Sequence, residues 1–367
     1  MRPCLPAMSR TFSKSLARGV LRLAVPGRRT SSCTGVARTV TTRARVLPAR
    51  FRQTVGAWAV LFLLATVLYG PFLWAGPAET RPLAAIVTSS ASEAYLEAIE
   101  GLRSELAAGR IGVFVVDLSR LSGPAELRQE IARRRPDLLV TIGNSAAETV
   151  AAETSIPFIV TMILRSKCAV TADEGRQSPL LVGSVSLDLS SEAIVGEIRR
   201  LFPDKQFLGV IQGRSSRLVD SAELQAAARK YGFSLKTAFC DGPEDLMDEF
   251  AALREFTDIV WTPPEFSLFN SATVKPLVLA SLRHRIAIVG FSSGFVRAGA
   301  AAGMYPHFFG VGRQTGRLAR KYLSDRQPQG HHGPESVRIA INERMLRLLG
   351  IRAEIPKNEG DRLELVR

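Results

Sequence analysis

The segment Gly290-Phe291-Ser292-Ser293-Gly294 has the Gly-x-Ser-x-Gly spacing of serine hydrolases. It follows an apolar run that predicts a strand, and a serine on such a turn can act as a nucleophile. A hydrolase also needs an acid and a histidine later in the chain, which Asp325 with His331 or His332 would supply. No HGGG-type oxyanion motif precedes the segment, so a glycine-flanked turn that lines a pocket explains it better than an esterase does.

Other motifs of catalysis or metal binding are missing from the sequence. There is no P-loop, no HExxH and no CxxC pair, and we expect no catalytic residue, no metal and no cofactor. His331 and His332 lie in a stretch rich in Gly, Pro and Gln, which predicts a solvated loop, with a weak metal site as the alternative. Cys168 and Cys240 sit in or beside apolar runs and are expected to be separate buried thiols rather than a disulfide.

Small polar residues follow several predicted strands. In open parallel sheets, ligands bind beyond the carboxyl ends of the strands, so these positions are the candidate ligand contacts. The alternative for each is a helix cap. An aromatic ring among them would pack against an apolar part of the ligand. The candidate residues are Ser89, Ser90, Asn144, Ser145, Thr161, Gln212, Glu265, Phe291 and Ser292.

The elements that must position these residues alternate along the chain. Apolar β-rich runs predict strands, and amphipathic stretches between them predict helices. Because the strands are continuously apolar, both faces of each sheet are expected to be covered by helices. Predicted strands span 83–90, 111–118, 156–164, 206–213, 234–240, 258–264 and 286–293. Predicted helices span 92–109, 123–136, 191–202, 221–232, 243–253 and 274–285, and the segment 137–153 predicts a strand, a tight turn and a helix. Two such series indicate an α/β protein of two lobes, each a parallel sheet covered by helices.

Charge is concentrated at one end of the chain. Of 367 residues, 48 are Lys or Arg and 34 are Asp or Glu, giving a net charge of +14. Residues 1–56 hold twelve of the basic residues and no acidic one, so the remainder carries only 14 − 12 = +2. A nearly neutral body argues against a nucleic-acid partner, and the basic segment 1–56 is expected to be disordered.

An uncharged segment, 57–78, follows the basic one, and its first nineteen residues, Ala57–Ala75, are almost all apolar. As a helix this run would be about 28 Å long, close to the thickness of a bilayer core. A basic flank, an apolar run and then small residues are typical of an export signal. The segment therefore predicts a periplasmic body, and both cleavage of the signal and its retention as an inner-membrane anchor remain open.

Several segments together resemble a known family. They are 135–161, 182–211, 223–235, 257–271, 286–325 and 341–356. In this ordered series the chain is similar to the substrate-binding proteins of ABC transporters, in the uncharacterised-uptake family with the type I periplasmic binding protein fold. The resemblance covers essentially all of residues 83–356. The lipoprotein Cys usual in the family is missing, and Glu265 stands where relatives often carry Asp.

The resemblance implies two lobes that close on a small organic ligand, for which an amino acid is one candidate, and an ABC permease as partner. On that model lobe one is 83–186 plus 303–327, and lobe two is 187–302 plus 328–356. No bond is made or broken. A membrane-anchored ligand sensor is the first alternative, because the same lobes could report to a partner, and the Gly-x-Ser-x-Gly esterase is the second.

Overall fold

The structure is a computed structural model, and it describes residues 81–172, 178–216, 218–355 and 360–366. All the elements below belong to the unit Glu79–Arg367. The basic segment 1–56 and the apolar segment 57–78 lie outside the described residues, as do Cys4 and Cys33.

The first sheet has six strands among the described residues, in the order β11-β5-β4-β3-β1-β2. All neighbouring strands in it are parallel, as the βα alternation predicts. The strands are β1 (Leu83–Thr88), β2 (Gly112–Asp117), β3 (Leu138–Ile142), β4 (Phe158–Ile163), β5 (Leu181–Ser186) and β11 (Gly330–His332). We call this sheet and its helices lobe one.

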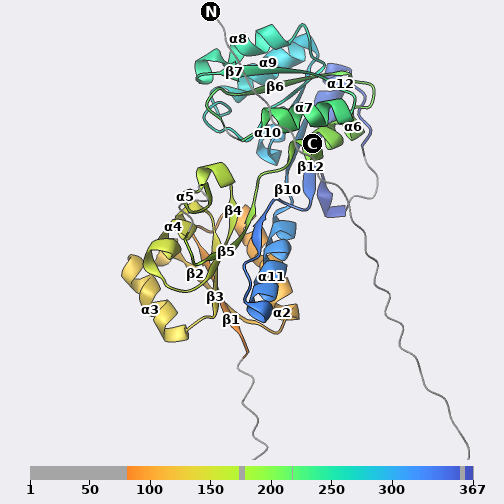
Figure 1. Cartoon of the computed structure of the whole chain (residues 1–367). Coiled ribbons are helices and arrows are strands. Elements are labelled where there is room, and N and C mark those ends of the chain that lie inside the picture. Colours follow the sequence, from red (N-terminus) through yellow and green to blue (C-terminus); the bar gives the residue numbers. More distant parts are fainter. Residues whose placement is uncertain (1–80, 173–177, 217, 356–359, 367) are drawn as a thin grey trace, which may run out of the picture. The chain divides into compact units, whose positions relative to one another are not determined.

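Helices cover both faces of the first sheet (Figure 1). On one face α2 and α11 pack on the apolar cluster that contains Ile86 and Val140, and on the other α3, α4 and α5 pack on the cluster that contains Val87 and Leu139. The helices are α2 (Glu93–Ala108), α3 (Pro124–Arg134), α4 (Asn144–Glu153), α5 (Ala169–Ala172) and α11 (Phe308–Asp325), with 3-10 turns η1 (Leu118–Arg120) and η2 (Arg165–Lys167).

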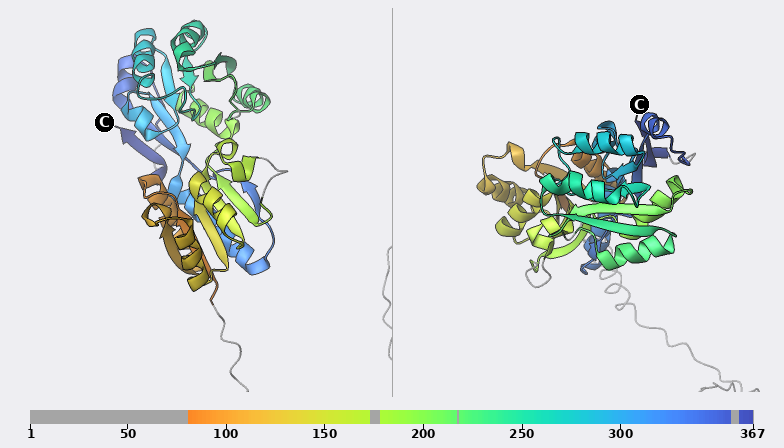
Figure 2. Two further views of the ribbon diagram at one scale, coloured as in Figure 1. Left: turned by 90° about the vertical axis from the view of Figure 1, so that its left-hand side faces the viewer. Right: turned by 90° about the horizontal axis from the view of Figure 1, so that it is seen from above.

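Helices α2 and α11 lie side by side although some 200 residues separate them in the sequence (Figures 1 and 2). Glycines permit this close approach. A Cβ on Gly312 would lie 2.0 Å from the carbonyl oxygen of Ala98, and one on Gly101 would lie 2.1 Å from that of Phe309. The glycine-rich run near residue 312 therefore serves helix packing.

The second sheet has seven strands among the described residues, in the order β13-β12-β10-β9-β8-β6-β7. Its pairs are parallel except β10 with β12. The strands are β6 (Phe207–Gly213), β7 (Ser234–Cys240), β8 (Ile259–Trp261), β9 (Ala287–Gly290), β10 (Ala302–Pro306), β12 (Val337–Asn342) and β13 (Leu363–Val366). The helices are α6 (Ser191–Leu201), α7 (Ser221–Lys230), α8 (Leu246–Leu253), α9 (Val274–His284), α10 (Ser293–Arg297) and α12 (Glu343–Leu349), with 3-10 turns η3 (Pro243–Asp245) and η4 (Gly360–Arg362). These elements form lobe two.

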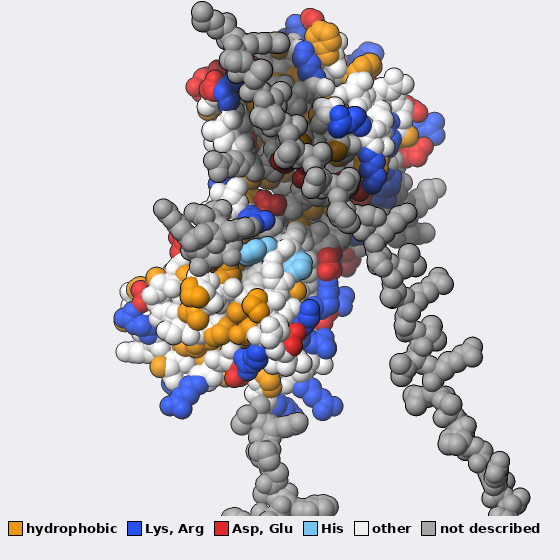
Figure 3. Space-filling view, viewed as in Figure 1, with side chains coloured by type: hydrophobic (Ala, Val, Ile, Leu, Met, Phe, Trp, Pro, Cys, Tyr) orange, Lys and Arg blue, Asp and Glu red, His pale blue; other side chains and the backbone are white. Residues whose placement is uncertain are grey.

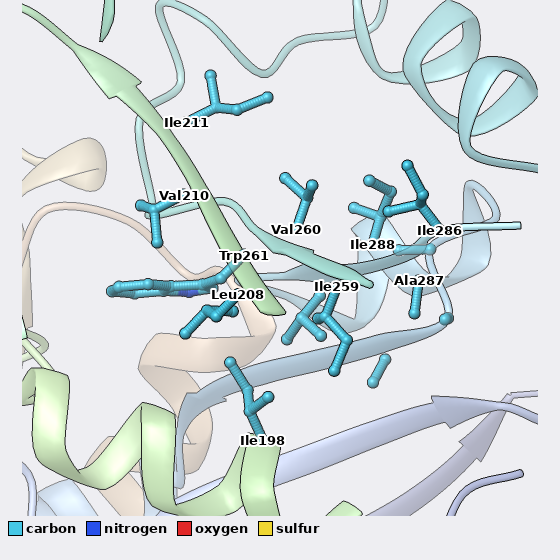
Figure 4. Packing of buried hydrophobic residues seen from close by; sticks show 14 of the residues in the cluster. Ile198, Leu208, Val210, Ile211, Ile259, Val260, Trp261, Ile286, Ala287 and Ile288 are labelled. Atoms are coloured by element: carbon cyan, nitrogen blue, oxygen red, sulfur yellow. The ribbon is translucent and has the colours of Figure 1, made fainter. Parts of the chain in front are cut away.

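Alternation along the strands sends side chains to both faces of the second sheet. In Figure 4, Leu208 and Trp261 point towards Ile198 of α6, and Ile211 and Val260 point the other way. All five belong to one buried apolar cluster, which explains why the sequence shows continuous rather than alternating apolar runs.

The chain crosses between the lobes three times, and two crossovers differ from expectation. The first joins β5 in lobe one to α6 in lobe two through residues 187–190. We expected the second at residue 303, but β10 (Ala302–Pro306) pairs with β9 and β12 in lobe two, so the chain crosses at His307. We expected the third at residue 328, but β11 pairs with β5 in lobe one, so the chain crosses at residues 333–336. Strand β13 extends lobe two beyond residue 356.

Candidate functional site

An apolar cavity of about 190 Å³ opens where the two lobes meet. Its walls come from the last residue of β8, from residues that follow β4, β5, β6, β8 and β9, from β10, and from the starts of α6 and α11. The lining residues are Leu164, Leu187, Asp188, Leu189, Ile194, Leu218, Val219, Trp261, Pro264, Phe266, Phe291, Ser292, Met304, Tyr305, Pro306 and Phe308. The site thus lies beyond the carboxyl ends of strands from both sheets, where parallel α/β folds hold ligands.

Aromatic rings dominate this cavity. Phe291 meets Phe266 edge to face, with ring centroids 5.2 Å apart and an interplanar angle of 83°, and Tyr305 lies 6.0 Å from Phe308. Trp261 is buried, whereas Phe266 is 68% exposed. A large apolar ring left in water at the edge of a cavity is a candidate surface for a ligand to cover.

Few polar groups reach the apolar cavity. Ser292 accepts a hydrogen bond from the backbone N–H of Phe295 at 3.1 Å, so its hydroxyl caps α10. The Tyr305 hydroxyl donates to Oε2 of Glu364 at 2.6 Å, and burial together with this carboxylate raises the pKa of Tyr305 far above its ordinary value. The carboxylate of Asp188 accepts the backbone N–H of Arg165 through Oδ2 at 2.8 Å. Its Oδ1 has capacity left for a ligand.

A second, polar cavity of about 670 Å³ adjoins the first, and Asp188, Leu189 and Leu218 line both. Its walls also come from both lobes. Lobe one and its ends supply Arg165, Ser166, Ser184, Ser186, His331, His332 and Gly333, and lobe two supplies Ser190, Asp220 and Glu223. Histidine side chains come to the surface close to acidic ones in the space-filling view (Figure 3).

The partners of the two histidines do not assemble a hydrolytic triad with Ser292. Nδ1 of His331 lies 2.7 Å from Oγ of Ser184, and Nε2 of His332 lies 2.7 Å from the carbonyl oxygen of Gln329. Asp325 accepts hydrogen bonds from Gln327 and Gln329. The Ser292 hydroxyl is instead engaged as a helix cap, which is the turn that the sequence favours over an esterase elbow.

The candidate residues of lobe one do not line the apolar cavity. Ser89 and Ser90 are held in the turn after β1, where Ser89 donates to the carbonyl oxygen of Ile142 and the carbonyl of Ser90 accepts from Thr88. Ser145 is exposed on α4.

Asn144 and Thr161 are tied to their own lobe. Asn144 donates from Nδ2 to the carbonyl of Lys167 at 3.2 Å, while its buried Oδ1 has no partner among the described residues. Thr161 is 1% exposed and bridges the carbonyl of Val185 and the hydroxyl of Thr315. Its hydrogen bonds join β4 to β5 and α11 rather than facing a cavity.

Of the four candidates in lobe two, Phe291 and Ser292 line the apolar cavity, and Gln212 and Glu265 do not. Glu265 is 7% exposed, and its Oε2 accepts the backbone N–H of Gly213 at 2.8 Å, so it closes the end of β6. Gln212 is 3% exposed, with an Oε1 that has no partner among the described residues.

Sequence reasoning missed most of the cavity wall. Trp261 and Tyr305 lie in apolar strands and look like ordinary core residues. Asp188 and Leu189 lie in the first crossover, and Phe308 follows the second. The sequence offered one signal, the carboxylate of Asp188 between two leucines, because an acidic residue is rarely buried among apolar residues unless its charge is paired.

Three further expectations concern metals, thiols and membranes. Within the described ranges, no group of three or more His, Cys, Asp or Glu side chains is placed to hold a metal ion. Cys168 and Cys240 are buried and free, as predicted, and burial raises the pKa of Cys240 to about 11. None of the helices that the structure describes is both long and apolar enough to span a bilayer.

Comparison with protein-family models places this chain in a family. The model of the family described as ABC transporter substrate binding protein matches residues 119–354. No curated protein matches the chain significantly.

Three solved structures are similar to this chain at low sequence identity. The ligand-free, open structure of a substrate-binding protein with adhesive properties from Clostridium difficile is 18% identical, covers 78% of this chain and 99% of its own, and has a TM-score of 0.60. A domain from Streptococcus pneumoniae in complex with L-Trp is 17% identical, covers 78% of this chain and 100% of its own, and has a TM-score of 0.49. A periplasmic ribose ABC transporter structure from Conexibacter woesei is 15% identical, covers 75% and 97%, and has a TM-score of 0.46.

The two sheets, parallel except for the pair of β10 with β12 and flanked by helices, are the type I periplasmic binding protein architecture, and the family model spans more than half of the sequence. This chain therefore belongs to the family of ABC transporter substrate-binding proteins.

Proposed function

We propose that the protein captures a small organic ligand with an apolar, ring-bearing part in the cavity between its lobes and delivers it to an ABC permease. The observation that carries this proposal is the aromatic cavity with walls from both lobes. Phe308 comes from lobe one, and Phe266, Phe291 and Trp261 come from lobe two. A ligand there would contact both lobes at once, and no covalent chemistry is needed.

Closure about the crossovers is the proposed mechanism. A ligand that touches both lobes binds the closed arrangement better than an open one, and this difference in affinity is the free energy that shifts the population. The crossovers at 187–190, His307 and 333–336 are short, so small changes in backbone dihedral angles there can reorient the lobes. The crossover at 187–190 also lines the cavity through Leu187, Asp188 and Leu189, so ligand contact and hinge position are linked in this segment.

The volume of the apolar cavity suits one ring system rather than a whole larger ligand. At about 30 Å³ for each water in the liquid, 190 Å³ holds roughly six water molecules. Edge-to-face and offset ring contacts with Phe291 or Trp261 would add to the burial energy of an aromatic group. An aromatic amino acid is one candidate.

The sensor alternative depends on residues 57–78, which lie outside the described residues. If that segment stays attached, the lobes are tethered to the inner membrane, and if it is cleaved, the body is released into the periplasm. N-terminal sequencing of the native protein distinguishes the two outcomes.

Native mass spectrometry of the gently purified full chain tests the function. We expect a fraction of the protein to carry a small molecule that is released on denaturation and that raises the melting temperature when it is added back. A chain that carries no small molecule, and that no amino acid, amine or sugar stabilises, would contradict the proposal.

A further inference from the structure

The charge of the polar cavity bears on the chemical class of the ligand. Among its described lining residues, the carboxylates of Asp188, Asp220 and Glu223 face one basic side chain, Arg165, together with His331 and His332. With neutral histidines the lining sums to −3 + 1 = −2. Such a chamber favours a cationic group and disfavours an anionic one.

Several backbone amides at the helix N-termini of this cavity already donate to protein oxygens, which weakens the attraction of these N-termini for an anion. At the start of α6, the carboxylate of Glu223 accepts a hydrogen bond from the backbone N–H of Ser191 at 2.8 Å. The hydroxyl of Ser190 accepts a hydrogen bond from the backbone N–H of Ala193. Asp220 accepts the backbone N–H of Glu223 in the first turn of α7 at 2.8 Å. A ligand carboxylate would therefore meet protein carboxylates in the positions where free amides could have held it.

Asp188 connects the two cavities. It is the one Asp or Glu among the described residues that line the apolar cavity, and it also lines the polar one. One of its oxygens accepts the backbone N–H of Arg165, which fixes the carboxylate in place. A group held by the other oxygen would sit at the boundary between a ring-sized apolar space and an acidic chamber.

Building on the function proposed above, we propose that the ligand is an aralkyl amine: its ring enters the apolar cavity and its ammonium group pairs with Asp188. The acidic chamber then discriminates against the corresponding amino acid, because the α-carboxylate would face Asp220 and Glu223. Specificity arises from repulsion of the zwitterion as well as from attraction of the amine.

Calorimetric titration of the purified full chain with matched pairs tests this directly. The pairs are tryptamine against L-tryptophan and phenethylamine against L-phenylalanine, both measured at pH 8. For at least one pair we expect the amine to bind about tenfold or more tightly than its amino acid, in line with a charge-assisted hydrogen bond.

Two variants separate the role of Asp188 from general charge. Asp188→Asn keeps an acceptor for the Arg165 amide, so the fold is retained, and it should weaken the amine about tenfold and bring the ratio between amine and amino acid close to one. Asp204→Asn removes the same charge from an exposed turn after α6 and should leave both affinities unchanged.

Each outcome bears on one of the two proposals. Amino acids that bind as tightly as the amines, or failure of both amines while another small molecule binds, would overturn the amine assignment and leave the solute-binding function standing. An unchanged ratio in Asp188→Asn would remove Asp188 from the site. Absence of any bound or stabilising small molecule would overturn the solute-binding function itself.

Discussion

Replacement of Phe266 by Ala should weaken ligand binding while leaving the fold intact. The ring lies at the edge of the apolar cavity, edge to face with Phe291 at 5.2 Å, and is 68% exposed. Because little of it is buried in the free protein, its removal opens no large cavity. Its contribution should appear when a ligand covers it.

The size of the effect follows from the exposed area. A Phe side chain offers about 200 Å² of surface, so 68% exposure leaves roughly 140 Å² in water. If the ligand covers half of this area, about 70 Å² is removed from water, which at about 25 cal/mol per Å² stabilises the complex by about 1.8 kcal/mol. That corresponds to a loss of roughly twentyfold in affinity.

Calorimetry with the ligand recovered from the native protein measures this loss. Phe256→Ala is the matched control, because Phe256 is 57% exposed on the same lobe, contacts Lys236 and does not line the cavity. Both variants should unfold within about 0.5 kcal/mol of wild type, as expected for surface substitutions. A change of less than threefold in Phe266→Ala, or an equal loss in both variants, would refute the placement of the ligand against Phe266.

Three further predictions concern packing, pH and the serine motif. Gly312→Ala should lower the free energy of unfolding by about 1–3 kcal/mol in chemical denaturation, because the added Cβ would lie 2.0 Å from the carbonyl oxygen of Ala98. Gly294→Ala is the control and should be nearly neutral, because the nearest atom to its added Cβ is 3.7 Å away. Burial holds the pKa of His307 below its ordinary 6.5, so the unfolded chain binds this proton more readily and stability should fall as pH drops below about 6.5. His307→Gln should remove part of that fall, and an identical pH profile would contradict the assignment. Ser292→Ala should lose about 1 kcal/mol of stability as a cap, and a fluorophosphonate should leave wild-type Ser292 unlabelled; labelling would restore the hydrolase alternative.

Periodicity and apolar runs predicted the architecture well because burial on both faces of a parallel sheet leaves a direct record in the sequence. The continuous apolar runs before Phe291 and after Lys205 correspond to β9 and β6. The same logic placed Phe291 and Ser292 at a strand end, and both line the cavity.

The crossovers and most of the cavity wall could not be read in this way. β10 is as apolar as its neighbours, and only its pairing with β9 and β12 shows that it belongs to lobe two. Glu265 resembles a ligand contact in the sequence, yet the backbone N–H of Gly213, 52 positions away, holds its carboxylate. In the sequence Trp261 looks like a core residue, and in the structure it is buried in the core and also lines the cavity. Contacts between residues far apart in the sequence determine each of these three outcomes, and the local sequence pattern does not record such contacts.

A crystal structure of the protein with its co-purified ligand tests most directly whether one small ligand contacts both lobes. We expect one molecule in contact with Phe291 of lobe two and Phe308 of lobe one. A ligand bound on a single lobe, or at a surface away from both rings, would contradict this expectation.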